Sequence, residues 1–317
     1  MMSLLVFKEK LKRIYGKYSL YLIPLVKFIV GFLTAWLINT NIGFMEELGG
    51  PFVPILFGLV ASFLPYGVTA FLAGLLVLAH ASQVSMEVTM ILFVFMLVVM
   101  MLYYGFHPGD GYLLLLTPMM FFFHLPYVVP LIVGLSGSLV SIVPVCCGVC
   151  IYYIILYLQQ NAGVLAGSSL PEMAERFIRI VQDVFGNELM WVMAAAFAAA
   201  VLVVFIIKNL SVDYSWSIAI IAGVIVQLAI IFIGDMRFNL PVSAGSMIIG
   251  ILLSVLAALV YQFFVFAVDY TRTEYLQYED DEYYYYVKAV PKIAVSAPDV
   301  KVQKIYSRKN MRRERKD

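Results

Sequence analysis

The sequence predicts an all-α, polytopic membrane protein with a bundle of about eight transmembrane helices, some of them broken or half-length, and a short, partly extended cytoplasmic tail. Hydrophobic residues make up 63% of the 317 residues and charged residues only 13%, whereas soluble domains carry about 25% charged residues. The apolar residues form long stretches, and most charged residues collect near the two ends of the chain. This composition indicates contact with lipid and excludes an ordinary soluble domain.

The composition divides the chain into a basic cytoplasmic segment at 1–18, a transmembrane bundle at 19–268 and a tail at 269–317. The first apolar stretch, 19–38, follows a run of lysines and is longer than the apolar region of a cleavable signal peptide, so we expect a signal-anchor helix. About 20 apolar residues are enough to cross the hydrocarbon core, which predicts seven further spans. These spans are 52–80, 86–105, 112–124, 127–158, 188–208, 215–234 and 242–268.

Three of these spans do not have the length of one crossing. As continuous helices, 52–80 and 127–158 would each be more than about 43 Å long, so they either tilt steeply or break. The stretch 112–124 is too short to cross alone. Each contains proline: Pro54, Pro65, Pro118, Pro130 and Pro144. Broken helices at membrane depth occur where protein or a water-filled cavity receives the freed backbone groups, which hints at transport.

The distribution of lysine and arginine predicts the orientation of the chain. Basic clusters at both ends favour cytoplasmic termini, which an even number of crossings allows. Eight spans then place Glu46 and Glu47, the turn at 107–110 and the segment 159–187 on the outer side. The loops 81–85 and 208–214 and the turn at His124 fall on the inner side.

The segment 159–187 contains one amphipathic helix, predicted at about 169–186. Ser169 and Glu172 have the spacing of a capping box, and apolar residues recur on one face. We expect this helix to lie along the membrane surface or on the outer face of the bundle.

Catalytic chemistry has little support in the sequence. No phosphate-binding loop, dinucleotide-binding glycine pattern, zinc-protease motif or serine elbow is present, so we expect no cofactor, and an enzyme would require convergent acid, base or metal groups in one cavity. The three cysteines Cys146, Cys147 and Cys150 lie in one apolar span without a nearby histidine or carboxylate, so no metal site is predicted. A net charge of +1 gives no basic field for nucleic acid.

Ionisable groups near the membrane are the best candidates for a transport path, because each is costly there. The turn at 106–111 combines His107 with Asp110, and Asp235 and Arg237 lie close together after a span. We expect these four residues at the outer mouth of a pathway and His124 near its inner end. The alternative is that the turn is an ordinary Pro-Gly-Asp-Gly turn. Lys27 lies within the first span. We expect either that the helix tilts so that its ammonium group reaches the interface, or that the side chain is buried against a partner.

A short internal similarity accompanies these residues. Phe-His-Leu-Pro at 123–126 and Phe-Asn-Leu-Pro at 238–241 each precede a long span that contains glycine and serine. Under the predicted topology they lie on opposite sides of the membrane, as an inverted repeat would place them, and such repeats underlie many secondary transporters.

The tail differs in composition from the bundle and is a candidate for binding a partner or a second copy. Its acidic and tyrosine-rich block comprises Glu279, Asp280, Asp281, Glu282, Tyr283 and Tyr284, and a basic run closes the chain. Alternating residues at 287–295 and 300–305 predict short extended segments. The basic run would contact anionic lipid of the inner leaflet.

Two functions from different classes agree with these patterns. The first is a multi-pass transporter or permease-like subunit of the plasma membrane, with an undefined substrate. The second is a scaffold or assembly subunit that transports nothing and anchors the cytoplasmic tail. A polar cavity that reaches the middle of the membrane would favour transport.

Overall fold

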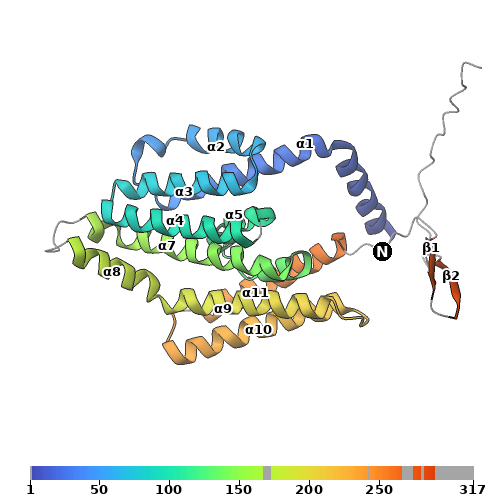
Figure 1. Ribbon diagram of the computed structural model, residues 1–317. Helices are drawn as coiled ribbons and strands as arrows, with labels where there is room; N and C mark the ends of the chain where they lie inside the picture. Colours follow the sequence, from blue (N-terminus) through green and yellow to red (C-terminus); the bar gives the residue numbers. More distant parts are fainter. Residues whose placement is uncertain are drawn as a thin grey trace, which may run out of the picture. The chain divides into compact units, whose positions relative to one another are not determined.

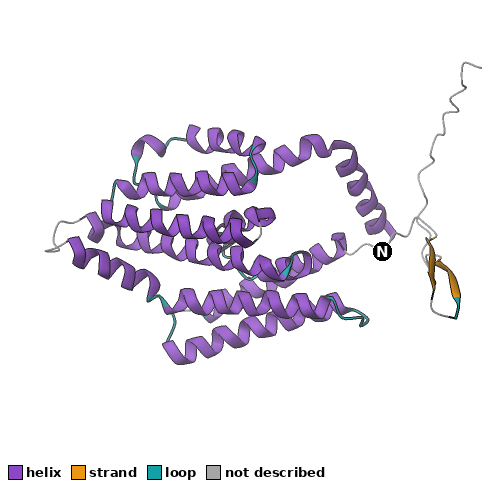
Figure 2. Ribbon diagram, viewed as in Figure 1, coloured by secondary structure: helices purple, strands orange, loops and turns teal. Residues whose placement is uncertain are grey.

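The computed structural model describes residues 2–106, 108–166, 173–241, 243–265, 274–279 and 282–289. The chain divides into two units, one of residues 15–266 and one formed by residues 1–14 and 267–317. Every described element of the larger unit is a helix (Figures 1 and 2). Six described helices are long and apolar enough to cross a membrane, so the chain is an integral membrane protein of the all-α class. The expected count of eight spans is not confirmed.

The six long helices account for most of the predicted spans. The predictions at 86–105, 188–208, 215–234 and 242–268 each correspond to one long helix. The long helices are α1 (Met2–Asn41), α4 (Met86–Phe106), α7 (Ile142–Ala166), α9 (Glu188–Lys208), α10 (Ser215–Phe238) and α11 (Ala244–Val265). The shorter helices are α2 (Phe52–Phe63), α3 (Tyr66–Ser82), α5 (Gly111–Phe122), α6 (Val128–Ser136) and α8 (Met173–Phe185). Single 3-10 turns lie at η1 (Glu46–Leu48), η2 (Pro108–Asp110) and η3 (Leu139–Ser141).

Both overlong spans break rather than tilt. The stretch 52–80 divides into α2 and α3 at Leu64 and Pro65, where the backbone is extended. This is the conformation that a residue before proline favours. The stretch 127–158 divides at 137–141, where Gly137 and Ser138 are extended.

The other prolines of these two spans do not cause the breaks. Pro54, Pro130 and Pro144 each lie in the first turn of a helix, namely α2, α6 and α7. A missing N–H costs nothing at that position. The prolines therefore mark where helices begin.

Hydrogen bonds and close contacts define two ends of the bundle. We call one end the Asp110 end, because Asp110 there bonds Ser141 at the start of α7. At the same end, Ser217 at the start of α10 bonds Gln262 near the end of α11. At the opposite end, called the His80 end, His80 bonds Asn39 near the end of α1. Neighbouring contacts extend the His80 end to the start of α4 and to α8, which share a buried cluster with Ala81 of α3.

Two pairs of short helices enter the bundle and turn back. Helix α2 runs from the His80 end toward Leu64, and α3 returns to His80. Helix α5 leaves the Asp110 end, turns at 123–127, and α6 returns to that end, where Lys208 bonds its last residues. At 12 residues α5 rises about 18 Å, well short of the hydrocarbon core of about 30 Å. The predicted span 112–124 is therefore one arm of a re-entrant hairpin.

These hairpins correct the predicted topology. Because α2 and α3 run out and back, the turn at 46–48 and the loop at 83–85 lie at the same end, whereas the sequence placed them on opposite sides. Asp110 and α8 lie at opposite ends, although both were assigned to the outer side. The six long helices still bring the first and last described residues of the larger unit, Tyr15 and Val265, to one end.

The internal similarity reflects the way in which two helices stop. His124 and Asn239 both have left-handed backbone, with φ of 58° and 49°. At the first site Leu125 N donates to Met120 O (2.8 Å), and at the second Asn239 N donates to Asp235 O (2.8 Å), as in common helix C-terminal caps. Helices α5 and α10 both run from the Asp110 end toward the His80 end, so the two motifs are not inverted. The inverted-repeat prediction is wrong.

Helix α8 packs on the bundle through part of its predicted apolar face. Ile180 and Val184 are buried in a cluster with Val88 of α4 and Leu158 of α7. Tyr157 Oη donates to Asp183 Oδ2 (3.3 Å), and Asn187 caps the next helix by accepting from Met190 N (3.2 Å). The predicted capping box at Ser169 and Glu172 lies outside the described residues.

The smaller unit contains a β-hairpin where the sequence predicted extended structure slightly later in the chain. Strand β1 (Glu274–Glu279) pairs antiparallel with β2 (Tyr284–Ala289), and Tyr278 faces Tyr285. The tyrosine run thus forms the first half of β2. The stretch 300–305 and most of 287–295 lie outside the described residues.

The corrected topology predicts which loops share a side of the membrane. On a background with the three native cysteines replaced by alanine, cysteines introduced at Gln83 and Gln182 should react with an impermeant maleimide from the same side. A cysteine at Ser211, in the exposed loop after α9 at the Asp110 end, should react from the other side. Labelling of sealed right-side-out and inverted vesicles measures this. If the cysteines at Gln83 and Gln182 react from opposite sides, the result would support the original prediction of one continuous crossing over 52–80.

Candidate functional site

The structure separates the predicted transport-path residues. Asp110 lies at the end of the bundle that is named after it. Asp235 and Arg237 lie at the opposite end, in the last turn of α10. The neighbouring Gly234 packs on Val192 near the start of α9, which places this turn at the His80 end. The length of α9, 21 residues or about 30 Å, separates the two ends. Asp110 therefore does not share a mouth with Asp235 and Arg237. His107 lies outside the described residues.

Asp110 is buried and belongs to a polar junction of three helices. Its carboxylate Oδ2 accepts a hydrogen bond of 2.5 Å from Ser141 Oγ, and Ser141 Oγ accepts one from Ser138 N (3.1 Å). Asp110 is also the N-cap residue of α5. The carboxylate thus fixes the start of α5 to the break between α6 and α7, a structural role that agrees with the turn alternative.

Backbone contact at the same junction requires glycine. A Cβ added to Gly111 would lie 2.6 Å from the backbone N of Gly67 and 2.7 Å from Tyr103 Oη. No side chain fits between these atoms. The first turns of α3 and α5 therefore touch directly, beside Tyr103 of α4.

Two lysines bond the carbonyl groups at the ends of the short helices. Lys27 Nζ of α1 donates to Leu64 O just after α2 (3.1 Å), and Lys208 Nζ of α9 donates to Leu135 O (3.0 Å) and Gly137 O (3.3 Å) at the end of α6. The last carbonyls of a helix have no partner within the helix and carry partial negative charge. Lys27 itself is half-buried, and its ammonium group bonds a backbone carbonyl beyond its own helix.

His124 lies at the tip of the α5–α6 hairpin rather than at an end of the bundle. Its carbonyl oxygen is within 3.4 Å of the Cβ position of Gly250, which is six residues into α11 from the His80 end. Its side chain is exposed on the surface of the bundle. Around the tip, Phe121 stacks on Tyr152 of α7 and on Phe197 of α9, with ring centroids 4.5 and 5.6 Å apart.

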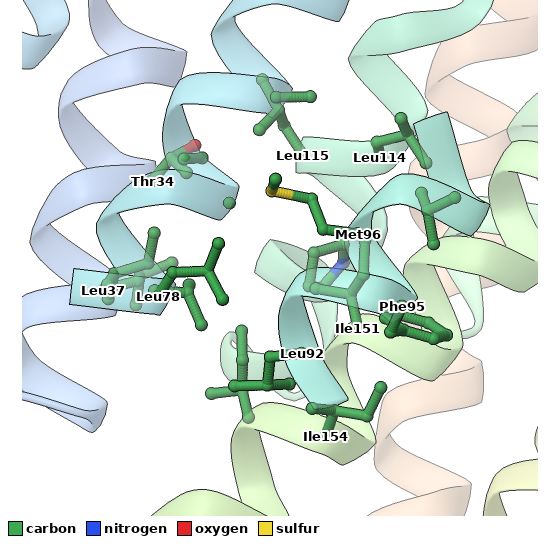
Figure 3. Close-up of a pocket in the computed structure, with 18 of the residues that line it drawn as sticks. Thr34, Leu37, Leu78, Leu92, Phe95, Met96, Leu114, Leu115, Ile151 and Ile154 are labelled. Atoms are coloured by element: carbon green, nitrogen blue, oxygen red, sulfur yellow. The ribbon is translucent and has the colours of Figure 1, made fainter. Parts of the chain in front are cut away.

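The main cavity lies between α1, α3, α4, α5 and α7 and has a volume of about 100 Å³. Figure 3 shows its labelled side chains surrounding a common space, with the Met96 thioether near the centre. Representative lining residues are Leu37, Leu78, Leu92, Met96, Leu115 and Ile154. Pro118 of the short helix α5 also lines it, so one wall belongs to the re-entrant hairpin.

The chemistry of the cavity is almost wholly apolar. Thr34 is the one lining residue with a polar side-chain group other than a thioether, and its hydroxyl donates to Val30 O of its own helix (2.8 Å). No acidic or basic side chain is among the lining residues. A smaller apolar space under α8 shares Leu92, Phe95 and Ile154 with the main cavity, and Phe95 also contacts the ring of Phe185 of α8.

Several buried polar residues escaped the sequence analysis, and His80 and Gln227 are the largest of them. His80 is fully buried; its Nδ1 accepts from Met45 N (3.2 Å), which leaves Nε2 to donate to Asn39 Oδ1 (3.0 Å) as the neutral tautomer. Its position near the end of an apolar stretch was the available signal. Gln227 in the middle of α10 is 1% exposed, and neither polar atom of its side chain has a protein partner. It lines neither of the cavities described above.

The cysteine span gives no metal centre within the described part of the chain. No group of three potential ligands from histidine, cysteine, aspartate and glutamate occurs among those residues. Cys146 Sγ instead lies 3.8 Å from Ala194 O, and Gly148 packs against Thr117 of α5. The small residues of this span serve helix packing.

The tail candidates fall around the turn of the β-hairpin. Glu279 ends β1, Glu282 and Tyr283 precede β2, and Tyr284 begins it; Asp280 and Asp281 lie outside the described residues. Tyr283 and Tyr284 are 62% and 69% exposed, and Tyr278 stacks on Tyr285 with ring centroids 5.3 Å apart. The hairpin thus presents several tyrosine rings on its surface.

The junction at Asp110 predicts a loss of stability when its carboxylate is removed. Asp110→Ala should lower the free energy of unfolding by about 1–3 kcal/mol, because the buried hydroxyl of Ser141 loses its acceptor. Asp213→Ala, in the exposed loop at the same end, should change it by less than about 0.5 kcal/mol. Unfolding in detergent micelles, followed by circular dichroism, measures both. Equal stability of the two variants would contradict a structural role for Asp110.

Comparison with known proteins finds no matching family model, no matching curated protein and no matching solved structure.

Proposed function

We propose that the bundle is a permease-like membrane subunit whose substrate is a lipid-like molecule, and that the main cavity receives a hydrocarbon chain of that substrate. The observation that carries the proposal is the apolar lining of a cavity between five helices, one of which belongs to a re-entrant hairpin.

The lining favours a hydrocarbon chain over an ion or a polar metabolite. Apolar surface removed from water contributes about 25 cal/mol per Å², and dispersion contacts add to this wherever a chain fills an empty space. A charged substrate needs polar partners at membrane depth. The lining residues supply one hydroxyl, that of Thr34, and its proton is already donated to Val30 O of its own helix. Apolar cavities of this kind stay dry and accept small apolar molecules.

The short helices support movement of a substrate over permanent storage. Helix α5 forms one wall of the cavity and ends at a left-handed turn partway along the bundle. Displacement of the α5–α6 hairpin would open the cavity without breaking a continuous transmembrane helix. Broken helices of this type occur at the binding sites of many transporters.

The proposed setting is the plasma membrane with both termini in the cytoplasm. The basic residues near both termini favour the cytoplasmic side under the positive-inside rule. If both α2 and α3 cross with the six long helices, the total is eight, as proposed from the sequence, although α2 is short for a full crossing.

Filling the cavity should stop transport of a lipid. Val99 lines the cavity, and its neighbour Val98 on α4 is 48% exposed on the outside of the bundle. In proteoliposomes that contain a fluorescent phospholipid, wild-type protein should move the lipid between leaflets, as measured by dithionite quenching. Val99→Phe should reduce the rate at least about tenfold, equivalent to about 1.4 kcal/mol, and Val98→Phe should not.

The same vesicles test the competing substrate classes. Uptake of ions and polar metabolites should stay at the level of protein-free vesicles for all three proteins. Ion uptake by wild-type protein that Val99→Phe leaves unchanged would contradict the proposal, as would equal lipid movement by the two variants.

A scaffold role remains the second candidate, and the β-hairpin favours it. Two-stranded sheets are only marginally stable alone, and the described part of this hairpin has two strands. The exposed tyrosines resemble the residues that are enriched at protein interfaces. Pairing with a second copy would complete the sheet.

Self-association through the tail has a direct measurement. Truncation that removes residues 281–317 deletes β2 and should convert an oligomer into a monomer in light scattering of the detergent-solubilised protein, while the bundle stays folded. A matched variant, Asp213→Ala in the bundle, should leave the mass unchanged. An identical mass for the full and truncated chains would count against the scaffold role.

A further inference from the structure

The first part of α1, residues 2–17, differs in composition from the rest of the helix and is separated from it by a break in the helical backbone. Helix α1 begins at Met2, far ahead of the predicted span 19–38, and its backbone is non-helical at Tyr18 (φ −115°, ψ 16°). The interruption separates a basic segment, Met2 to Lys17, from the apolar segment that continues to Asn41. The direction of the first segment is therefore not fixed by that of the span.

Apolar side chains of this segment form one stripe. They recur at intervals of three and four residues, which places them within about 100° of one another around the helix. All remain exposed, so the described part of the chain leaves the stripe open. The exposed fractions are 55% for Leu4, 51% for Phe7, 38% for Leu11, 49% for Ile14 and 44% for Tyr18.

Basic side chains border the stripe on both sides. At 100° per residue, Lys8 and Lys12 fall beside one edge, Lys10 and Lys17 beside the other, and Arg13 on the opposite face. Glu9 is the one acidic residue among residues 2–17. An open apolar stripe edged by lysines is the pattern of a helix that lies in the plane of a membrane surface.

We propose that residues 2–17 lie in the headgroup layer of an anionic leaflet, with the apolar stripe inserted and the flanking lysines at the level of the lipid phosphates. Charge complementarity identifies the partner as anionic phospholipid, because the segment contains five basic residues and one acidic residue. Covalent continuity supports the same partner: the segment joins a membrane-spanning helix at Tyr18 and is about 24 Å long, so it cannot leave the vicinity of the bilayer. A nucleic acid would use the lysines but not the stripe. This inference is independent of the proposed lipid transport.

The test places spin labels on the full-length protein in lipid nanodiscs. On the background without native cysteines, labels at Phe7 on the stripe and at Arg13 on the opposite face are compared in phosphatidylcholine and in phosphatidylcholine mixed with phosphatidylglycerol. In the mixed discs, the Phe7 label should be accessible to oxygen and protected from a water-soluble nickel chelate, and the Arg13 label should show the reverse. In pure phosphatidylcholine, the difference in oxygen and nickel accessibility between the two labels should be smaller.

A charge variant separates lipid binding from burial against protein. Replacement of Lys8, Lys10, Lys12 and Lys17 by glutamine should remove the difference between the two lipid compositions. Nickel access at both labels in both compositions would overturn the proposal, because the segment would then lie in water. Protection of the Phe7 label that neither lipid composition nor the lysine variant changes would also overturn it, because the stripe would then contact protein.

Discussion

A helix that ends within apolar sequence must find partners for its last carbonyl groups, and this constraint organises the bundle. Helices α2 and α6 both end inside apolar sequence, and each end is bonded by a lysine from another helix, Lys27 or Lys208. Without water, an unsatisfied carbonyl costs several kcal/mol. Lysine supplies three donors on a long stem, so its charge can reach a helix end from a neighbouring element. The hairpins depend on these contacts, and the cavity in turn depends on α5.

The cavity and the charged residues occupy different parts of the molecule. Asp110, Lys208 and the neighbouring serines form polar contacts at one end of the bundle, where they hold helices together. The space between α1, α3, α4, α5 and α7 is lined almost entirely by carbon and sulfur atoms. Of the ionisable residues that the sequence offered for a path, Asp110 lies at a junction between helices. A function that uses the cavity must use apolar chemistry.

The sequence predicted the long helices well because their signal is local. Helix α9 matches the predicted 188–208 at both boundaries, since Asn187 is a good N-cap and the apolar run ends at Lys208. The returning hairpins could not be predicted, because a break at Leu64 and Pro65 shows in the sequence but the direction of the next helix does not. That direction depends on partners distant in sequence, such as Lys27 for Leu64 and Gly67 for Gly111. The cavity likewise depends on five helices meeting, and none of its lining residues is unusual alone.

The lysine contacts also set an order for biosynthesis. Lys27 precedes its acceptor Leu64 by 37 residues, so the ribosome has already made the donor when α2 is completed. Lys208 follows Leu135 by 73 residues. During translation the end of α6 therefore gains this donor only after α9 has been made. A ribosome that pauses between these two points would hold the α5–α6 hairpin without this lysine donor.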